Sequence, residues 1–396
     1  MSSLSPSSDS EPSYLPRLPT ELLFEVLSND WFNLIELAGF ARVSHQWLEP
    51  VRQALYGRLV LDLGGLHRRS DNDITLPTGT RKMLSTLRES PELAKLPKAV
   101  EITAYCATEV RESTSETTTI ESVVSEFFDL ASKIESVHLD IVDDHNGAFE
   151  AAFRKHGSKI KYFVDGGMSR RRLELIDGCF PNLQQLKTGC LPVTLPPRIL
   201  GLRLSDVDLG DEGNTDVVTA FLDSSSSSLR RLSVRLCVAA ELDYFKYPDL
   251  EYLHVHADSG SAYDPTIPRR LRKHDLWTRL SEAPSITTLS FDGEVYGGTS
   301  EEELFATWGL GKQSSESLFT KIKRIEHRGG VKLDRIATLM QHAWLPEGLQ
   351  IVVPFDPFIE EQDRHRFSVT NLLQINALSA MCYTHDAELI FSLDQL

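Results

Sequence analysis

Apolar residues recur along this chain in two periods, one helical and one extended. Near the N-terminus, Leu22, Leu23, Val26 and Leu27 form two adjacent i, i+4 pairs. They follow Pro19, a residue that a helix tolerates in its first turn because its missing N–H would have no partner there. This spacing predicts a short helix that begins at about Pro19.

Two further apolar patches complete an N-terminal helical segment. One consists of Leu34, Ile35, Leu37 and Ala38, and the other, after a possible N-cap at Ser44, consists of Trp47, Leu48, Val51 and Leu55. The pattern predicts three short helices with apolar side chains on more than one face. So short a segment cannot bury all of these groups by itself, so either the rest of the chain or another protein covers the remainder.

The rest of the chain alternates between helical and extended patterns. Strands are predicted at 99–103, 136–142, 160–164, 183–188, 199–205, 229–236, 250–257, 286–293, 322–329, 349–355 and 387–393, and helices at 121–132, 148–157, 216–225, 274–283 and 334–345. The polar stretch after Asp62 predicts a loop or an irregular first unit. Because helices separate the strands, parallel neighbours are expected.

Three helix-to-strand junctions share a sequence signature. "FPNLQQLKTG", "YPDLEYLHVHA" and "APSITTLSFDG" each place a proline, a polar residue, a Leu or Ile, two spacers and a Leu. Such an irregular internal repeat predicts a solenoid in which stacked units share one core. The fold class predicted is therefore α/β, with three N-terminal helices followed by an irregular α/β solenoid of parallel strands. The competing fold, a doubly wound α/β domain, lacks its glycine-rich binding turn here.

Composition and charge exclude several classes of function. The formal net charge is −16, which repels phosphate backbones and disfavours nucleic-acid binding. Residues 1–14 are rich in Ser and Pro and predict a disordered tail without the features of a signal peptide. No apolar run reaches the roughly 20 residues of a membrane span. Five scattered cysteines suit a reducing compartment, so the expected location is the cytoplasm or nucleus.

Motifs for catalysis or cofactor binding are weak. "GLGKQS" at 309–314 departs from a phosphate loop at Ala306 and Gln313, and His254 and His256 share a strand face without a recognisable third metal ligand. We therefore expect no catalytic residues, no metal and no cofactor. The serine run within 223–231 predicts a flexible turn. Basic clusters at 169–172, 269–274 and 321–332 are either solvated surfaces or part of a site for an acidic or phosphorylated partner, if they converge.

The N-terminal segment resembles an F-box. The resemblance covers Leu15 to Asp62 and rests on "LPTELLFEVLSND", "LIELAGFARVSHQWLEPV" and "LYGRLVLD", with His45 where the family usually has Cys or Arg. The body resembles a divergent leucine-rich-repeat array without a regular Asn or Cys ladder. These resemblances imply a tail at 1–14, an F-box at 15–62 and a substrate-binding solenoid at 63–396. They also imply docking on a Skp adaptor, and through it a cullin, by Leu18, Pro19, Leu22, Leu23, Val26 and Trp47, with Leu27, Leu37 and Val51 internal.

Three functional hypotheses remain open from the sequence. The first is a non-enzymatic substrate receptor of a Skp–cullin–F-box ubiquitin ligase, whose target protein the sequence does not identify. The second is a stand-alone repeat scaffold for protein–protein interaction, in which the N-terminal helices form only a cap. The third is an α/β enzyme with an unfamiliar site.

Overall fold

A computed structural model provides the fold of the chain. It describes residues 19–27, 34–42, 45–66, 73–106, 118–141, 146–166, 176, 178–191, 195, 199–212, 215–256, 279–280, 283–292, 321–328, 348–354, 379–380, 382–383 and 387–392. The predicted helix at 334–345 lies outside these residues, and only the end of the predicted helix at 274–283 lies within them.

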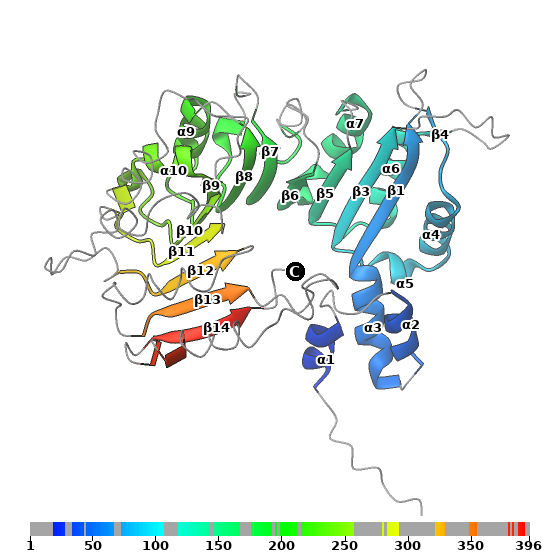
Figure 1. The fold of residues 1–396 in the computed structure, drawn as a ribbon. Helices are drawn as coiled ribbons and strands as arrows, with labels where there is room; N and C mark the ends of the chain where they lie inside the picture. The colour runs from blue at the N-terminus through cyan, green and yellow to red at the C-terminus, as the bar shows by residue number, and fades with distance from the viewer. Residues whose placement is uncertain are drawn as a thin grey trace, which may run out of the picture.

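Helices and strands alternate through most of the described chain (Figure 1). The helices are α1 Thr20–Leu27, α2 Leu34–Phe40, α3 His45–Gly57, α4 Thr78–Glu89, α5 Pro91–Ala94, α6 Ile120–Leu130, α7 Asn146–His156, α9 Thr215–Ser224 and α10 Leu236–Glu241, with 3-10 turns η1 Gly157–Lys159, η2 Ile199–Gly201 and η3 Tyr244–Lys246. The strands are β1 Arg58–Leu66, β2 Asp73–Ile74, β3 Ala99–Cys106, β4 Thr118–Thr119, β5 Ser136–Ile141, β6 Tyr162–Asp165, β7 Gln185–Cys190, β8 Asp206–Glu212, β9 Arg231–Arg235, β10 Tyr252–His256, β11 Thr288–Asp292, β12 Arg324–Arg328, β13 Gln350–Pro354 and β14 Glu388–Ser392.

The described strands form one sheet whose order follows the chain. From β3 to β14, each strand pairs in parallel with the next long strand of the sequence, and β1 joins the other side of β3 in parallel. Only the short strands β2 and β4 at the β1 edge are antiparallel. The α/β class with parallel strands is thus confirmed. Among the described parallel strands, from β1 to β14, the order never reverses as it would in a doubly wound sheet; only the short antiparallel strands β2 and β4 lie on the other side of β1.

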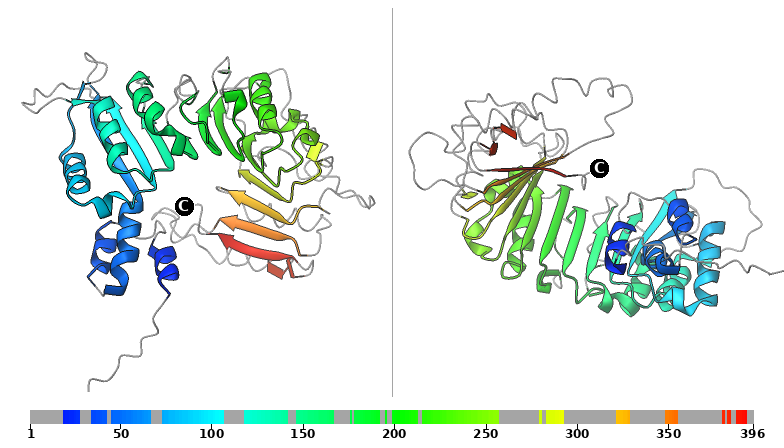
Figure 2. Two further views of the ribbon diagram at one scale, coloured as in Figure 1. Left: turned by 180° about the vertical axis from the view of Figure 1, so that it is seen from behind. Right: turned by 90° about the horizontal axis from the view of Figure 1, so that it is seen from below.

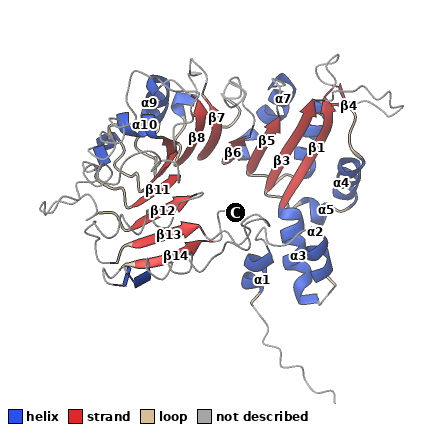
Figure 3. Cartoon of the chain, in the orientation of Figure 1, coloured by secondary structure: helices blue, strands red, loops and turns tan. Residues whose placement is uncertain are grey.

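Strand alternation divides the sheet into an apolar face and a polar face. Val137, Phe163, Leu186, Val207 and Leu232 stand opposite one another along successive strands, and all are buried. They belong to a single large core. The helices that follow the strands lie on the outside of the arc that the sheet forms (Figures 1–3). The polar face therefore lines the concave side.

A repeated backbone pattern shows that the units are structurally equivalent. The carbonyl of the residue before a strand accepts two N–H groups from the next unit: the Lys161 oxygen accepts from Gln184 and Gln185, and the Arg230 oxygen from Glu251 and Tyr252. The same arrangement recurs from β3 to β12. In the three junctions that share a sequence signature, the residue two positions after each proline, Leu183, Leu250 or Ile286, is buried in the core.

Apart from the two-residue strands β2 and β4, which the sequence did not predict, the structure differs from the strand predictions in two places. The strand predicted at 199–205 is wrong, because η2 occupies its start and the strand begins only at Asp206. Leu202 and Leu204 are buried although they precede the strand. The alternating apolar pattern at 199–205 therefore reflects the packing of a turn against the core and not the pairing of a strand. The second difference is β1, which the sequence did not predict and which pairs with β3 along most of its length. The boundary expected between residues 62 and 63 falls inside β1.

The three N-terminal helices have a small apolar core of their own. Both α1 and α2 contact α3. Leu27, Leu37 and Val51 are buried together, which confirms the prediction that these three side chains are internal. Their cluster is separate from the large core of the sheet. Phe40, Ala41, Trp47, Ala54 and Leu55 pack around it while remaining partly exposed.

Candidate interaction surfaces

The first candidate surface is the exposed face of the N-terminal helices. Leu22 and Val26 lie one turn apart on α1, with 47% and 45% of their surface exposed, and Pro19 just before the helix is also exposed. On α2, Ile35 is 85% exposed. Solvent exposure of several apolar side chains on two short helices is a feature of protein-binding surfaces.

The other expected docking residues have different environments. Leu23 is only 2% exposed, so in this structure its side chain belongs to the interior and not to the exposed face. Trp47 is half-buried at the rim of the small core, with its ring centroid 5.4 Å from that of Phe40. Leu18 lies outside the described residues. Among the described residues of α1, the open face therefore consists of Leu22 and Val26 without Leu23.

The second candidate surface is the polar concave face, where charged side chains pair across neighbouring strands. Lys187 on β7 stands opposite Asp208 on β8, with its Nζ 2.9 Å from Asp208 Oδ2. Nε2 of His256 on β10 lies 3.5 Å from Asp208 Oδ1 and 2.7 Å from Oγ of Ser233 on β9. Side chains from four consecutive strands thus form one polar cluster.

The environment of Asp208 favours its carboxylate. Burial alone would raise the pKa of Asp208, but interactions with His256, Lys187 and Ser233 outweigh burial and lower it well below its ordinary value. At the neighbouring Asp206 burial prevails instead, and it raises the pKa in spite of Arg231. Asp208 is therefore charged at neutral pH and holds the polar cluster together.

The same cluster does not have the geometry of a catalytic triad. In a triad, the serine and the carboxylate contact different nitrogens of the imidazole, so that the ring relays a proton between them. Here Ser233 and Asp208 both lie closest to His256 Nε2. A single nitrogen cannot accept the serine proton while it donates to the carboxylate. The three residues are arranged for hydrogen bonding and not for nucleophilic attack.

A second polar cluster lies beside the first, toward the C-terminal end of the sheet. The Tyr252 hydroxyl on β10 donates to Glu326 Oε2 at 3.1 Å and accepts from Arg328 Nη2 at 2.7 Å. The Arg231 guanidinium lies 4.4 Å from the centroid of the Tyr252 ring, and Arg324 Nε is 2.8 Å from Glu326 Oε1. Charges of both signs are thus paired on this part of the concave face.

Two histidines on β10 pack edge to face, and one of them, His256, belongs to the first cluster. The ring centroids of His254 and His256 are 4.3 Å apart, and Nδ1 of the buried His254 lies 2.8 Å from Ser290 Oγ on β11. Within the described ranges, no three His, Cys, Asp or Glu side chains are placed to hold a metal ion. The contacts that are present fix both rings within the hydrogen-bonded surface.

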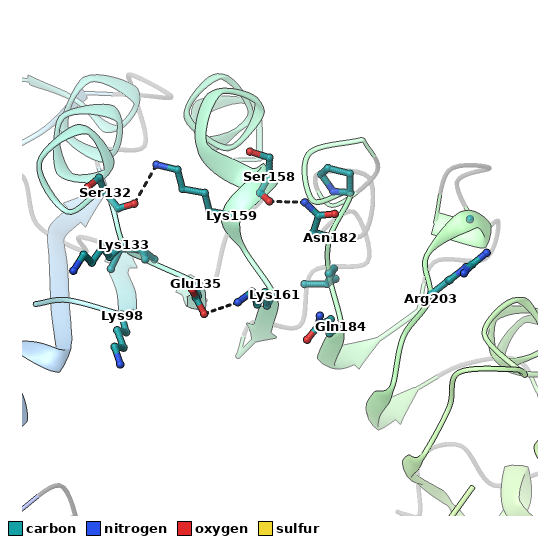
Figure 4. Close-up of a pocket in the computed structure, with 14 residues that line it drawn as sticks. Lys98, Ser132, Lys133, Glu135, Ser158, Lys159, Lys161, Asn182, Gln184 and Arg203 are labelled. Atoms are coloured by element: carbon teal, nitrogen blue, oxygen red, sulfur yellow. Dashed lines mark hydrogen bonds and ion pairs between the residues drawn. The ribbon is translucent and has the colours of Figure 1, made fainter. Parts of the chain in front are cut away.

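A third candidate surface is a groove of about 890 Å³ that runs along the N-terminal ends of the strands, here called the strand-entry edge (Figure 4). Its charged lining residues are Lys98, Lys133, Lys159, Lys161, Arg203 and Glu135. The groove is therefore strongly basic in a chain of net charge −16. Sequence reasoning missed it because its cations are not in one run but come from successive units that the fold brings together.

The described residues of the basic clusters predicted from sequence are not among the lining residues of this groove. The clusters at 169–172 and 269–274 lie outside the described residues, as does 329–332 of the third. The described part of that third cluster includes β12, where Arg324 and Arg328 contact Glu326. The convergence of the three clusters, a question that the sequence leaves open, is therefore not tested by the described residues.

Comparisons with known proteins leave the chain without an assigned family. No protein-family model matches it, and a search of curated proteins likewise finds no match. Among the described helices, none is long and apolar enough to cross a membrane.

Proposed function

We propose that this chain is the substrate-recognition subunit of a Skp–cullin–F-box ubiquitin ligase. In this proposal α1–α3 dock on the Skp adaptor, which links the chain to a cullin, and the curved sheet holds the target protein. The observation that carries the proposal is a three-helix N-terminal module that keeps a core of its own while exposing Leu22 and Val26.

The separate core favours a docking module over a simple cap. A cap stabilises a solenoid by contributing its apolar stripe to the solenoid's core, so its buried residues would join the large cluster. Leu27, Leu37 and Val51 instead form their own cluster. Exposed apolar groups outside this cluster, among them Leu22, Val26 and Ile35, are then available to a partner.

The concave face supports the substrate-binding part of the proposal. Long parallel solenoids bind other proteins across extended concave surfaces. Here that surface offers hydrogen-bonding groups from Lys187, Asp208, Tyr252 and Glu326 that neighbouring strands hold in place. In the proposed role the chain transfers nothing itself; it brings the target close to the ubiquitin-charged enzyme at the other end of the cullin.

The test is adaptor binding by the full chain with the exposed face altered. We expect Leu22→Glu with Val26→Glu to abolish co-purification with a Skp adaptor, because charges would replace the apolar contact. Val60→Glu is a matched control, since Val60 is a similarly exposed valine on β1, outside the helices. Equal binding by the double variant and the control would refute the assigned face.

One observation favours the alternative, a stand-alone scaffold with a helical cap. Helix α3 ends at Gly57 and β1 begins at the next residue, while Tyr56 packs against the large core. Deleting residues 1–62 cannot separate the two hypotheses, because it removes part of β1. Thermal stability can: if the body covers the Leu22 and Val26 face in solution, the double variant lowers Tm, whereas an open face leaves Tm unchanged.

A further inference from the structure

The groove along the strand-entry edge differs from the concave face in whether its cations are paired with carboxylates. On the concave face Lys187, Arg231 and Arg324 each contact a carboxylate. In the groove, the side chains of Lys98, Lys133 and Arg203 are exposed and form no ion pair with any described residue. The groove therefore presents positive charge that the described part of the chain does not neutralise.

Two more cations of the groove, Lys159 and Lys161, contact other groups of the chain but can still bind an anion. Lys159 Nζ donates to the Ser132 carbonyl oxygen at 3.1 Å, which satisfies one of its three N–H groups. Lys161 Nζ lies 2.9 Å from Oε2 of Glu135, the one carboxylate among the described lining residues (Figure 4). Because this pair is about half exposed, its Lys161 ammonium remains able to bind a second anion.

The floor and walls of the groove suit a polypeptide. Buried Ile134 and Leu183 form part of its base. Asn182 and Gln184 add carboxamides beside the cations, and a peptide backbone needs such donors and acceptors (Figure 4). None of the described residues that line the groove has an aromatic side chain. Proteins that hold single-stranded nucleic acids stack bases on aromatic rings, so the composition favours a peptide over an oligonucleotide.

The dimensions indicate the length of segment that fits. Lys98 precedes β3 and Arg203 precedes β8, and these strands are four spacings apart in the sheet. At about 4.8 Å for each spacing the distance is roughly 19 Å. An extended chain at about 3.3 Å per residue covers this distance with roughly six residues.

We propose that this groove binds an extended acidic segment of a partner protein, with Lys98, Lys133, Lys159 and Arg203 contacting successive carboxylates. The acidic segment crosses the edges of β3 to β8, away from the concave face. This inference does not rest on the ligase role, because it concerns a different surface and needs no adaptor. Failure of either proposal leaves the other standing.

The experiment is fluorescence anisotropy of the purified full chain with labelled peptides of about eight residues. The probe alternates Glu and Ser, and the control peptide alternates Gln and Ser. We expect saturable binding of the Glu peptide at low ionic strength, weakening as salt increases, and none of the Gln peptide. No binding of the Glu peptide, or equal binding of both peptides, would overturn the proposal.

Substitutions then locate the site. Lys98→Gln with Arg203→Gln removes a cation from each end of the groove and is expected to weaken binding by about three- to tenfold. Arg81→Gln with Lys82→Gln makes the same change in charge on α4 and is expected to leave binding unchanged. Equal affinity in both variants would contradict the assigned groove.

Two further measurements test whether the variant is folded and whether the groove prefers a peptide to a nucleic acid. Lys98→Glu with Arg203→Glu should gain affinity for a Lys–Ser peptide, which a misfolded variant would not do. A single-stranded oligonucleotide of similar length should bind more weakly than the Glu peptide. Tighter oligonucleotide binding that is lost in the groove variant would replace the acidic peptide with a nucleic acid and overturn the proposal.

Discussion

Lys187 and Asp208 stand directly opposite each other on β7 and β8, and 2.9 Å separates Lys187 Nζ from Asp208 Oδ2. Parallel pairing in register is what brings them together, since 20 intervening residues separate them in the sequence. With His256 and Ser233 they tie together four strands of the concave face. Contacts of this kind hold the side chains of the concave face in defined positions.

Asp208→Asn tests whether this carboxylate stabilises the sheet. We expect a loss of about 1.5–3 kcal/mol in the free energy of unfolding at neutral pH, the range for hydrogen bonds to charged groups. The measurement is chemical denaturation of the variant and the wild type. A loss below about 0.5 kcal/mol would show that the cluster does not stabilise the fold.

The same variant makes a prediction about pH. Because folding lowers the pKa of Asp208, its stabilising contribution is complete above the unfolded pKa of about 4 and disappears as pH falls through the folded pKa, which lies lower. The difference in stability between wild type and Asp208→Asn should therefore shrink as pH falls below about 4. A difference that grows in that range would contradict the assigned cause.

Ser225 should be structural although it lies in a run of five serines. Its hydroxyl is buried, donates to the Leu202 carbonyl at 3.0 Å and lies 3.3 Å from the Leu204 amide nitrogen, so it joins the turn after α9 to the preceding unit. Ser225→Ala should cost about 1–3 kcal/mol because these backbone groups lose their partner. Exposed Ser227→Ala is the control, and thermal unfolding compares the two. Equal Tm values would show that the Ser225 hydroxyl has no structural role.

Leu27→Ala tests whether the N-terminal helices form a separate unit. Leu27 is 1% exposed within the small core, so its truncation should cost about 2–5 kcal/mol of local stability. Hydrogen exchange should then speed up in α1–α3 while β5–β10 stay protected. Loss of protection throughout the sheet would instead show that the two cores unfold together.

The sequence predicted most strands because their signal is local. Alternation at 250–257 and 286–293 fits β10 and β11, whose apolar side chains point into the core. β8 was missed because "DVDLGDE" is rich in Asp and Gly, which have low strand propensity. Pairing with β7 and β9 on its two sides overrides that propensity.

The surfaces could be predicted only in part. The stripe of Leu22 and Val26 was visible because both lie on one helix, but the burial of Leu23 depends on tertiary packing. The turn at 223–231 was predicted to be flexible, yet Ser225 is fixed by its neighbours in the preceding unit. The basic groove joins Lys98 and Arg203 across more than 100 residues, so no local pattern reveals it.

The central claim is that the N-terminal helices expose a face for a Skp adaptor. The most direct measurement is isothermal titration of the purified full chain with a purified Skp adaptor. We expect a one-to-one complex that Leu22→Glu with Val26→Glu abolishes and Val60→Glu retains. A folded, monodisperse wild-type chain that gives no binding would contradict the claim and favour the capped scaffold.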